Sequence, residues 1–490
     1  MTDTTPDLGL DHPTLVRQRA FVDGTWVGAA SGATYPVTDP ATGEVLTEVP
    51  AMDADDARRA IEAANQAFPA WAAKTASERG TLLRRWFDLM VDNADDLGRI
   101  MTLEQGKPLP EARGEVLYGA SFVEWFAEEA KRAYGDVIPT FTPDKRLLVL
   151  RQPVGVAAAI TPWNFPNAMI TRKAGPALAA GCTFLVKPAG DTPLSALALA
   201  DLASRAGIPQ GVFNVVTARD PGPVGEELTT NPLVRKFSFT GSTGVGKQLL
   251  ARAASTVKNV SMELGGNAPF LVFDDADIDA AVEGAIHSKY RNGGQTCVCA
   301  NRMYAQDGIH DEFAAKLADA SAALRVGPGV GEGVDIGPLI NMSALEKVDR
   351  LVGQAVAGGA AVLTGGRSSN LGGTFYEPTV LTGVSADMAI AEEEIFGPVA
   401  PVFRFSTEEE AVAAANDTPY GLAAYFYSRD NSRIWRVSEA LEYGMIGVNT
   451  GLMSTTLAPF GGWKESGIGR EGSYQGIDEY LETKYVAIGI

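Results

Sequence analysis

The sequence predicts an α/β protein in which helices cover parallel sheets. From Pro153 onwards, short apolar segments alternate with glycine turns and helical segments, which is typical of parallel strands joined by crossover helices. A second pattern of this kind starts near Ala268 and runs to about Asn449. With 490 residues, the chain is also too long for one ordinary core. We therefore expect two or three domains.

The chain before these patterns is expected to be mixed. Residues 1–52 carry short alternating stretches broken by Gly and Pro, which indicates strands and turns. The pattern from Asp53 to about Glu129 is helical, and the acidic run at Asp53 is typical of a helix start. Residues 134–149 return to extended structure, with two prolines as breakers.

The elements of the first α/β pattern can be assigned in order. Because ligands bind at the carboxyl ends of parallel strands, the residues that follow its strands are candidates for a site. The last stretch of the chain, 483–490, is predicted to be a strand and is a candidate for pairing with a neighbouring subunit. The predicted strands of the first pattern are 154–160, 183–187, 212–216 and 236–239, and its helices are 169–180, 194–206 and one that ends at Ala254.

Composition argues against several function classes. The net charge of −19, from 41 basic and 60 acidic residues, disfavours a nucleic-acid or anionic-membrane partner. No apolar run is long enough for a membrane span, and the polar first ten residues lack the features of a signal or transit peptide. Three cysteines give no disulfide framework, so a reducing, cytoplasmic location is expected. The three histidines are scattered, and no metal site is predicted.

The stretch 290–301 carries the strongest chemical signal. It places Cys297 and Cys299 one residue apart, after a Gly-Gly-Gln-Thr turn. Glycines let the backbone approach a ligand closely, and a thiol on such a turn can attack a substrate carbonyl while its own amide points at the oxygen. For a cysteine considered alone, an inert buried thiol is the alternative.

Three further residues are candidates for the same chemistry. Glu263 lies among apolar and glycine neighbours, which favours a raised pKa and work as a general base, with an ordinary paired carboxylate as the alternative. Lys187 ends a predicted strand, where a lysine either contacts a ligand or is solvated at the surface. Asn164 follows another strand and is either an oxyanion donor or a turn residue.

The glycine loop 241–247 is a weaker signal. It almost fits the phosphate-binding loop of nucleotide hydrolases, but Gln248 stands where that loop needs Ser or Thr for Mg²⁺. Its glycine order also differs from the ordinary dinucleotide fingerprint. A strand before the loop and a helix after it still favour an anion at the helix start.

Seven motifs occur in an order that resembles the aldehyde dehydrogenase superfamily, over roughly residues 20 to 487. The segments 169–182, 291–299 and 451–454 are most similar to the succinate-semialdehyde dehydrogenase branch. The seven motifs are Pro162-Trp-Asn-Phe-Pro, Val186-Lys-Pro-Ala, Phe239-Thr-Gly-Ser, Met262-Glu-Leu-Gly-Gly, Gly294-Gln-Thr-Cys, Glu394-Ile-Phe-Gly-Pro and Pro459-Phe-Gly-Gly-Trp-Lys-Glu-Ser-Gly.

The resemblance implies a Rossmann-like parallel-sheet cofactor domain, an α/β catalytic domain and a small β oligomerisation element. Such enzymes are homodimers or homotetramers. The implied cofactor domain comprises residues 1–134 and 154–263, the catalytic domain 264–450, and the oligomerisation element 135–153 and 470–490, while residues 451–469 return to the active site.

The resemblance also implies a mechanism. The Cys297 thiolate attacks the aldehyde carbon, and the side-chain amide of Asn164 and the Cys297 backbone N–H hold the resulting oxyanion. Hydride passes to NAD or NADP and leaves a thioester, which a water activated by Glu263 hydrolyses to the acid.

Cofactor contacts follow residue by residue from the matching motifs. Lys187 is expected at the adenosine ribose and Glu394 at the nicotinamide ribose. NAD-preferring relatives often carry Glu where this chain has Gly190, so the carboxylate that would repel a 2′-phosphate is missing and NADP is expected to be accepted well. The other expected cofactor contacts are Trp163, Pro188, Ala189, Gly241, Ser242, Leu264 and Phe396.

The expected substrate is succinate semialdehyde, whose distal carboxylate needs local cations in so acidic a protein. Arg172, Arg291 and Ser454 are the expected contacts, and pairing of the arginines with structural acids is the alternative. Glutarate semialdehyde is one methylene longer and stays an alternative substrate. Cys299 is predicted to be a redox partner that can trap Cys297 as a disulfide, or else a spectator.

Two other function classes are compatible with single motifs of the sequence. A phosphate-loop nucleotide hydrolase would use the glycine loop, which Gln248 disfavours. A cysteine hydrolase would use Cys297 without a redox cofactor, but it needs a histidine partner, and only His287 lies near the motif in sequence.

Overall fold

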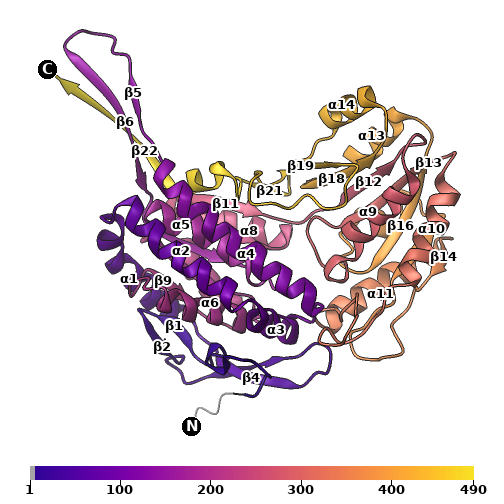
Figure 1. Cartoon of the computed structure of the whole chain (residues 1–490), viewed down its shortest axis with the longest axis horizontal. Helices are drawn as coiled ribbons and strands as arrows, with labels where there is room; N and C mark the ends of the chain where they lie inside the picture. The colour runs from indigo at the N-terminus through magenta and orange to yellow at the C-terminus, as the bar shows by residue number, and fades with distance from the viewer. Residues whose placement is uncertain (1–5) are drawn as a thin grey trace.

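Two sheets organise the chain, and each belongs to its own lobe (Figure 1). The computed structural model describes residues 6–490. The predicted α/β class is confirmed, because parallel strands alternate with helices in both lobes. None of the helices in the described part of the chain combines the length and the hydropathy that crossing a bilayer demands.

The first sheet has the strand order β2-β1-β9-β8-β7-β10-β11-β21. Its five central strands are parallel, and the order reverses between β7 and β10. A crevice opens at the carboxyl ends of the strands at such a switch point, and ligands bind there. The strands are β1 Ala20–Val22, β2 Thr25–Val27, β7 Val156–Ile160, β8 Thr183–Lys187, β9 Phe213–Val215, β10 Val234–Thr240, β11 Asn259–Glu263 and β21 Gly467–Ile468.

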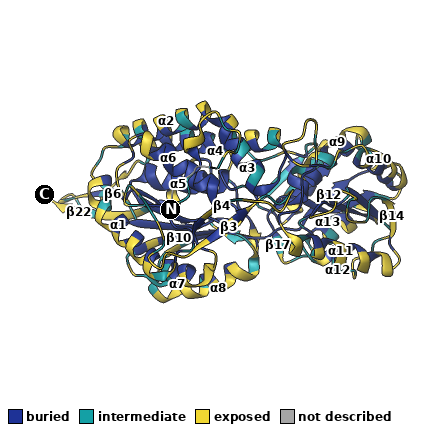
Figure 2. Ribbon diagram, turned by 90° about the horizontal axis from the view of Figure 1, so that it is seen from below, coloured by how far each residue is buried: buried dark blue, intermediate teal, exposed yellow. Residues whose placement is uncertain are grey.

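Alternate residues of this sheet face two helical layers, and both faces are buried (Figure 2). In β7, Ala157 and Ala159 belong to the core under α2, α4, α5 and α6, while Ala158 and Ile160 belong to the core under α1, α7 and α8. This is the two-residue period of a strand that is covered on both sides. The helices are α1 Ala54–Ala72, α2 Ala76–Asp92, α3 Ala94–Gln105, α4 Leu109–Glu129, α5 Ala168–Ala180, α6 Pro193–Arg205, α7 Pro221–Thr230 and α8 Thr243–Ala253.

The helix starts follow local capping chemistry. Asp53 caps α1 through a reciprocal capping box with Asp56, as the acidic run predicts. Every strand and helix predicted between residues 53 and 254 is present. The sequence pattern does not predict α7, because the Pro-Gly-Pro at its start indicates a turn as strongly as a first helical turn.

The second sheet has the order β14-β15-β16-β13-β12-β18-β19 and is parallel except for β14. The loop between α9 and β13 carries Cys297, so the thiol lies at the amino end of a strand. The strands are β12 Ala268–Val272, β13 Ala300–Gln306, β14 Ala361–Thr364, β15 Thr379–Thr382, β16 Val399–Phe405, β18 Ala423–Tyr427 and β19 Met445–Val448. The helices are α9 Ile278–Tyr290, α10 His310–Ala322, α11 Met342–Ala357, α12 Ala389–Glu392, α13 Glu408–Asn416 and α14 Asn431–Ala440.

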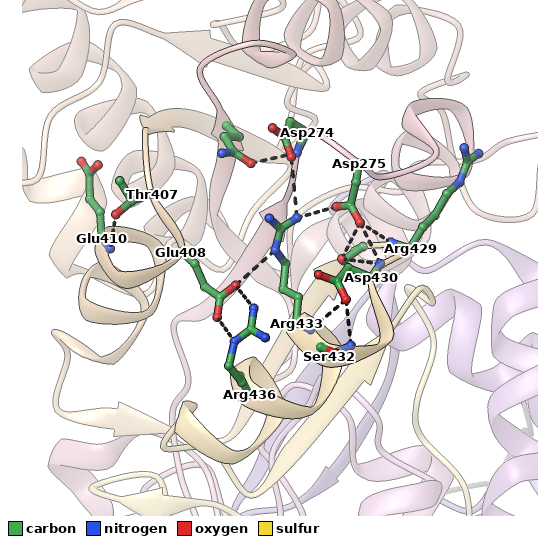
Figure 3. Close-up of polar contacts among 12 residues, drawn as sticks. Asp274, Asp275, Thr407, Glu408, Glu410, Arg429, Asp430, Ser432, Arg433 and Arg436 are labelled. Atoms are coloured by element: carbon green, nitrogen blue, oxygen red, sulfur yellow. Dashed lines mark hydrogen bonds and ion pairs between the residues drawn. The ribbon is translucent and has the colours of Figure 1, made fainter.

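A charged network fixes the outer helices of this lobe (Figure 3). Arg433 of α14 pairs with Asp275, in the loop after β12, and with Glu408 at the start of α13. Glu408 also accepts two hydrogen bonds from Arg436. Arg433 stacks on the Phe273 ring at 4.6 Å, so the network joins both helices to the end of the sheet.

An arm projects from the first lobe (Figure 1). It consists of β5 Asp136–Ile138, β6 Lys145–Pro153 and β22 Leu481–Gly489, in the order β22-β6-β5. The predicted terminal strand is therefore confirmed. It pairs along one edge with β6 of the same chain, and its pairing with a neighbouring subunit stays a prediction. Its other edge is open in this sheet, and apolar side chains on the arm such as Val137 and Tyr485 are exposed.

Two small antiparallel pairs complete the strands. They are β3 Thr34–Thr38 with β4 Val45–Pro50, and β17 Tyr420–Gly421 with β20 Trp463–Lys464.

Candidate active site

Cys297 lies in the wall between two cavities. One cavity has a volume of about 500 Å³ and the other about 320 Å³, and only Cys297 and Met169 line both. The site forms where the carboxyl edge of the first sheet meets the amino edge of the second. Residues after β7, β10 and β11 come from the first sheet, and residues before β13 and β16 come from the second.

The turn before Cys297 has an unusual backbone. Asn292, Gly293 and Gly294 have successive φ values of 52°, 62° and 77°, in the left-handed region. Glycine adopts this region without strain and asparagine does so more readily than most residues. The Asn292 side chain fixes the turn, because its Nδ2 donates to the Asn164 carbonyl at 3.0 Å and its Oδ1 accepts from Gln105 at 3.0 Å.

The segment that joins the two sheets makes a close backbone contact with Cys297. A Cβ added to Gly266 would lie 2.3 Å from the Cys297 carbonyl oxygen, so only glycine permits this contact. Tyr425 donates to the Val298 carbonyl at 2.8 Å from β18. The nucleophile candidate is thus held by elements from both sheets.

The larger cavity contains six of the ten predicted cofactor residues. The Glu394 carboxylate accepts the Gly266 N–H at 3.1 Å, and burial raises its pKa to about 7. Trp163 and Phe396 meet edge to face, with ring centroids 5.5 Å apart. The six predicted residues in the lining are Trp163, Gly241, Ser242, Leu264, Glu394 and Phe396.

Four predicted cofactor residues lie outside this cavity lining: Lys187, Pro188, Ala189 and Gly190. Lys187 is buried at the end of β8 and donates to the Pro188 carbonyl at 2.9 Å. Burial lowers its pKa to about 8, and Asp191 and Asp220 oppose this change. Gly190 approaches the loop after β9, where a Cβ would lie 3.4 Å from the Ala218 carbonyl oxygen.

Sequence reasoning missed part of this lining. Lys347 of α11 donates to the Glu394 carbonyl at 2.5 Å, and Thr240 has a buried hydroxyl without a hydrogen-bond partner in residues 6–490. Thr240 stands in the quoted motif before Gly241, so the motif contained a signal for it. Lys347 lies on an ordinary amphipathic helix and gives no such signal.

The smaller cavity contains all three predicted substrate residues, Arg172, Arg291 and Ser454, with Cys297. Arg172 is 1% exposed, forms an ion pair with Glu471 and stacks over Phe460 at 4.2 Å. Arg172 therefore pairs with an acid of the protein, which the sequence left open as the alternative to a substrate contact. Its Nη2 nevertheless has no hydrogen-bond partner in the described chain.

Arg291 differs from Arg172 in this respect. It is partly exposed, lies over the Phe165 ring at 5.1 Å and makes no hydrogen bond or ion pair with residues 6–490. Its fork of donors is therefore free to receive an anion.

A buried network that sequence reasoning missed supports the same wall. Lys107 forms an ion pair with Glu115 and donates to the Asn164 carbonyl at 2.7 Å. Glu115 in turn accepts the backbone N–H groups of Asn167 and Ala168 at the start of α5. The Gln105-Gly106-Lys107-Pro108 turn, which brings Lys107 inwards, was the available sequence signal.

The three predicted catalytic residues differ in their surroundings. Burial raises the pKa of the Cys297 thiol to about 12, while Arg172 and Arg291 oppose this and Glu394 and Glu263 add to it. The Asn164 side chain lines the larger cavity beside Cys297, and its Nδ2 donates one hydrogen bond to the Gln295 carbonyl at 3.0 Å. An amide nitrogen has two N–H groups, so the second one is available for an oxyanion.

Glu263 ends β11 and lines neither cavity. Its residue is 2% exposed, and both carboxylate oxygens lack a hydrogen-bond partner in the described part of the chain. Burial and the neighbouring charge of Glu471 raise its pKa well above the usual range, against Arg172 and Lys173. A carboxyl group in such surroundings can accept a proton near neutral pH.

Cys299 is a free, buried cysteine that lines neither cavity. Its Sγ accepts a hydrogen bond from Lys289 Nζ at 3.4 Å, and burial raises its pKa while Lys289 opposes that rise. Its predicted part in a redox switch stays a prediction. No group of three His, Cys, Asp or Glu side chains within residues 6–490 is arranged to hold a metal ion.

Comparisons with known proteins agree on one family. The model of the aldehyde dehydrogenase family matches residues 26–486. The chain is 62% identical to glutarate-semialdehyde dehydrogenase of Pseudomonas aeruginosa over 475 residues, 97% of this chain and 98% of that one. It is 60% identical to the NADP(+) succinate-semialdehyde dehydrogenase of Escherichia coli over 481 residues, 98% of this chain and all of that one. The crystal structure of succinate-semialdehyde dehydrogenase from Burkholderia pseudomallei matches with a TM-score of 0.97 at 59% identity, covering 98% and 100%.

The raised pKa of Cys297 predicts how this thiol reacts with pH. In the cofactor-free enzyme, alkylation of Cys297 by iodoacetamide should accelerate about tenfold per pH unit up to about pH 9.5, because only the thiolate reacts and its fraction keeps rising below the pKa. Peptide mass spectrometry follows the modification, and Cys297→Ser serves as the control against Cys299 and Cys182. A rate that levels off below about pH 8 would contradict the electrostatic assignment.

Proposed function

Because the chain belongs to the aldehyde dehydrogenase family, we propose that it oxidises succinate semialdehyde to succinate with NADP⁺ or NAD⁺. The observation that carries this proposal is the position of Cys297 between a large cavity and a smaller one with arginine in its wall. The reaction consumes the aldehyde, water and the oxidised cofactor, and it yields the acid, the reduced cofactor and a proton.

The larger cavity fits a nicotinamide cofactor. It lies at the switch point of the first sheet, and Ser242 begins α8, whose free N–H groups favour a phosphate. The Glu394 carboxylate and the unpartnered Thr240 hydroxyl are suited to ribose and amide groups. When bound, the cofactor accepts a hydride from the carbon attached to sulfur. Lys187 to Gly190 are proposed to hold its adenosine end.

The protein's own groups supply the other steps. Cys297 loses its proton and attacks the aldehyde carbon, and the free N–H of Asn164 and the Cys297 backbone N–H hold the oxyanion. After the thioester has formed, Glu263 takes a proton from water, and the hydroxide displaces Cys297 from the acyl carbon. The acid leaves, and the thiol regains a proton.

The smaller cavity supports a substrate with a distal carboxylate. Arg291 offers a free guanidinium, Ser454 offers a hydroxyl, and Arg172 adds positive charge even though Glu471 partly neutralises it. Glutarate semialdehyde is the second candidate, because a relative at 62% identity carries that name and a pocket distinguishes one methylene by only about 1–3 kcal/mol.

The other two function classes are disfavoured by contacts as well as by family. Lys247 of the glycine loop forms an ion pair with Glu465, which directs it away from a phosphate-loop role. His287 lines a small cavity that shares Arg291 and Ser454 with the smaller cavity but lacks Cys297, and no histidine in residues 6–490 hydrogen-bonds to Cys297.

We propose the division into cofactor, catalytic and oligomerisation parts, which the presence of two sheets and an arm supports. The open edge of β22 suits assembly into a homodimer or homotetramer. Three free cysteines suit a reducing, cytoplasmic location. When the loop moves, hydrogen peroxide is proposed to oxidise the Cys297 and Cys299 thiols to a disulfide, and the peroxide is reduced to water.

Glu263→Gln tests the general base. The amide cannot take a proton from water, so kcat should fall by about 10²- to 10⁴-fold. In the wild type, kcat should rise with pH as Glu263, whose pKa is raised, loses its proton, and this rise should be weaker in the variant. A kcat within about threefold of wild type would remove Glu263 from the mechanism.

Arg291→Ala tests the carboxylate contact. It should raise KM for succinate semialdehyde at least about tenfold, because a hydrogen bond to a charged group is lost, and cost far less for uncharged butanal. Arg291 is the cleaner choice, since Arg172→Ala would also take a cation from Glu471. Equal losses on both aldehydes would mean that the arginine supports the fold or the cofactor.

Gly190→Glu tests the cofactor preference. The wild type should accept NADP⁺ well, and a more than hundredfold preference for NAD⁺ in kcat/KM would contradict the proposal. A glutamate should weaken NADPH binding at least about tenfold by repelling the 2′-phosphate, as followed by cofactor fluorescence. Gly190→Gln is the matched control of equal size without charge, and a Cβ at this position would lie 3.4 Å from the Ala218 carbonyl oxygen, an ordinary contact.

A further inference from the structure

The lining of the smaller cavity includes polar residues that are not among the predicted substrate contacts, and Tyr118 is one of them. Tyr118, on α4, lines it together with Arg172, Arg291 and Cys297. No motif in the sequence points to Tyr118, because it lies 179 residues before Cys297 on a helix of mixed pattern. Its ring is fixed edge to face against Phe122, with centroids 4.9 Å apart.

The Tyr118 hydroxyl has an unused hydrogen-bonding capacity. Its oxygen is enclosed by the protein beside the Arg172 guanidinium, which can only donate, and its own O–H is donated to no residue among 6–490. Burial raises the pKa of this hydroxyl, and the charges of Arg172 and Arg291 are the strongest influences against that rise. The hydroxyl therefore stays protonated as a donor and lies within the field of both guanidinium groups.

Other donors around the cavity are also unused. Arg172 Nη2 and the Thr296 hydroxyl have no partner in the described chain, and Arg291 makes no hydrogen bond or ion pair there. Buried donors without partners are costly, so several such groups in one wall indicate a ligand rich in acceptors.

The acidic side chains in the same wall do not accept hydrogen bonds from these donors. Glu115 is paired with Lys107 and accepts two backbone N–H groups of α5. Glu111 accepts the Asn292 N–H at 2.8 Å. The surplus in this cavity is therefore one of hydrogen-bond donors, which matches a carboxylate with about four acceptor sites.

We propose that the Tyr118 hydroxyl donates a hydrogen bond to the distal carboxylate of the bound semialdehyde and, with Arg291, makes the enzyme prefer aldehydes that carry an anion. This rests on the proposed oxidation of a carboxylate-bearing aldehyde. The two residues have different tasks. The planar fork of Arg291 supplies charge and two hydrogen bonds, while the packed ring of Tyr118 supplies one donor in a fixed direction.

Tyr118→Phe removes the hydroxyl and keeps the ring against Phe122. It should raise KM for succinate semialdehyde roughly tenfold, with kcat little changed, and raise KM for butanal less than about threefold. Tyr35→Phe is the matched control, because Tyr35 is also buried and its hydroxyl also lacks a partner in the described chain, but it lies in β3 outside this cavity.

A second readout avoids turnover. Succinate should protect Cys297 of the cofactor-free enzyme against iodoacetamide, and half-protection should need roughly ten times more succinate in Tyr118→Phe than in wild type or Tyr35→Phe. If the wild type does not prefer succinate semialdehyde to butanal, the proposed function fails. If the wild type has that preference and Tyr118→Phe keeps it unchanged, or loses both substrates equally, the role of Tyr118 is wrong while the proposed function stands.

Discussion

The site depends on one backbone turn. Three successive left-handed residues, Asn292 to Gly294, place Cys297 in the wall between the two cavities, and the Asn292 side chain ties the turn to the chain that follows β7. Through that tie, the carboxyl edge of the first sheet and the amino edge of the second share one wall. A cofactor at the switch point and an aldehyde on the other side could then meet at a single sulfur.

Burial governs the chemistry of that wall. It raises the pKa of Cys297 to about 12 and raises the pKa of Glu263 well above its usual range. Protein acids already engage the cations nearby, Lys107 with Glu115 and Arg172 with Glu471. Arg291 and Tyr118 are among the groups of the smaller cavity that keep free donors, and the substrate's anion is proposed to meet these two.

The sequence could predict what depends on local patterns. Short apolar segments between helical stretches predicted β7, β8 and β10, and the acidic run at Asp53 predicted a helix start. Both signals arise within a few residues of the chain. The gathering of Cys297, Asn164, Arg172 and Arg291 followed from motif resemblance rather than from physics. The roles of Lys107 and Tyr118 could not be predicted, because they depend on the long-range packing of α4 against α5. Whether the Tyr118 hydroxyl stays without a hydrogen-bond partner also depends on which residues this packing brings near it. The placement of Lys187 to Gly190 outside the larger cavity likewise depends on how the loops after β8 and β9 meet.

The central claim is that Cys297 carries the acyl group between the two cavities. The most direct test is to mix enzyme, NADP⁺ and succinate semialdehyde, quench in acid within the first turnover, and map the modified peptide by mass spectrometry while counting the NADPH formed. We expect a succinyl group on Cys297 and one NADPH for each succinyl group. Acylation of another residue would contradict the account. In Glu263→Gln, where hydrolysis of the thioester should be slow and the acyl-enzyme should accumulate, NADPH formed without any acyl-enzyme would contradict it too.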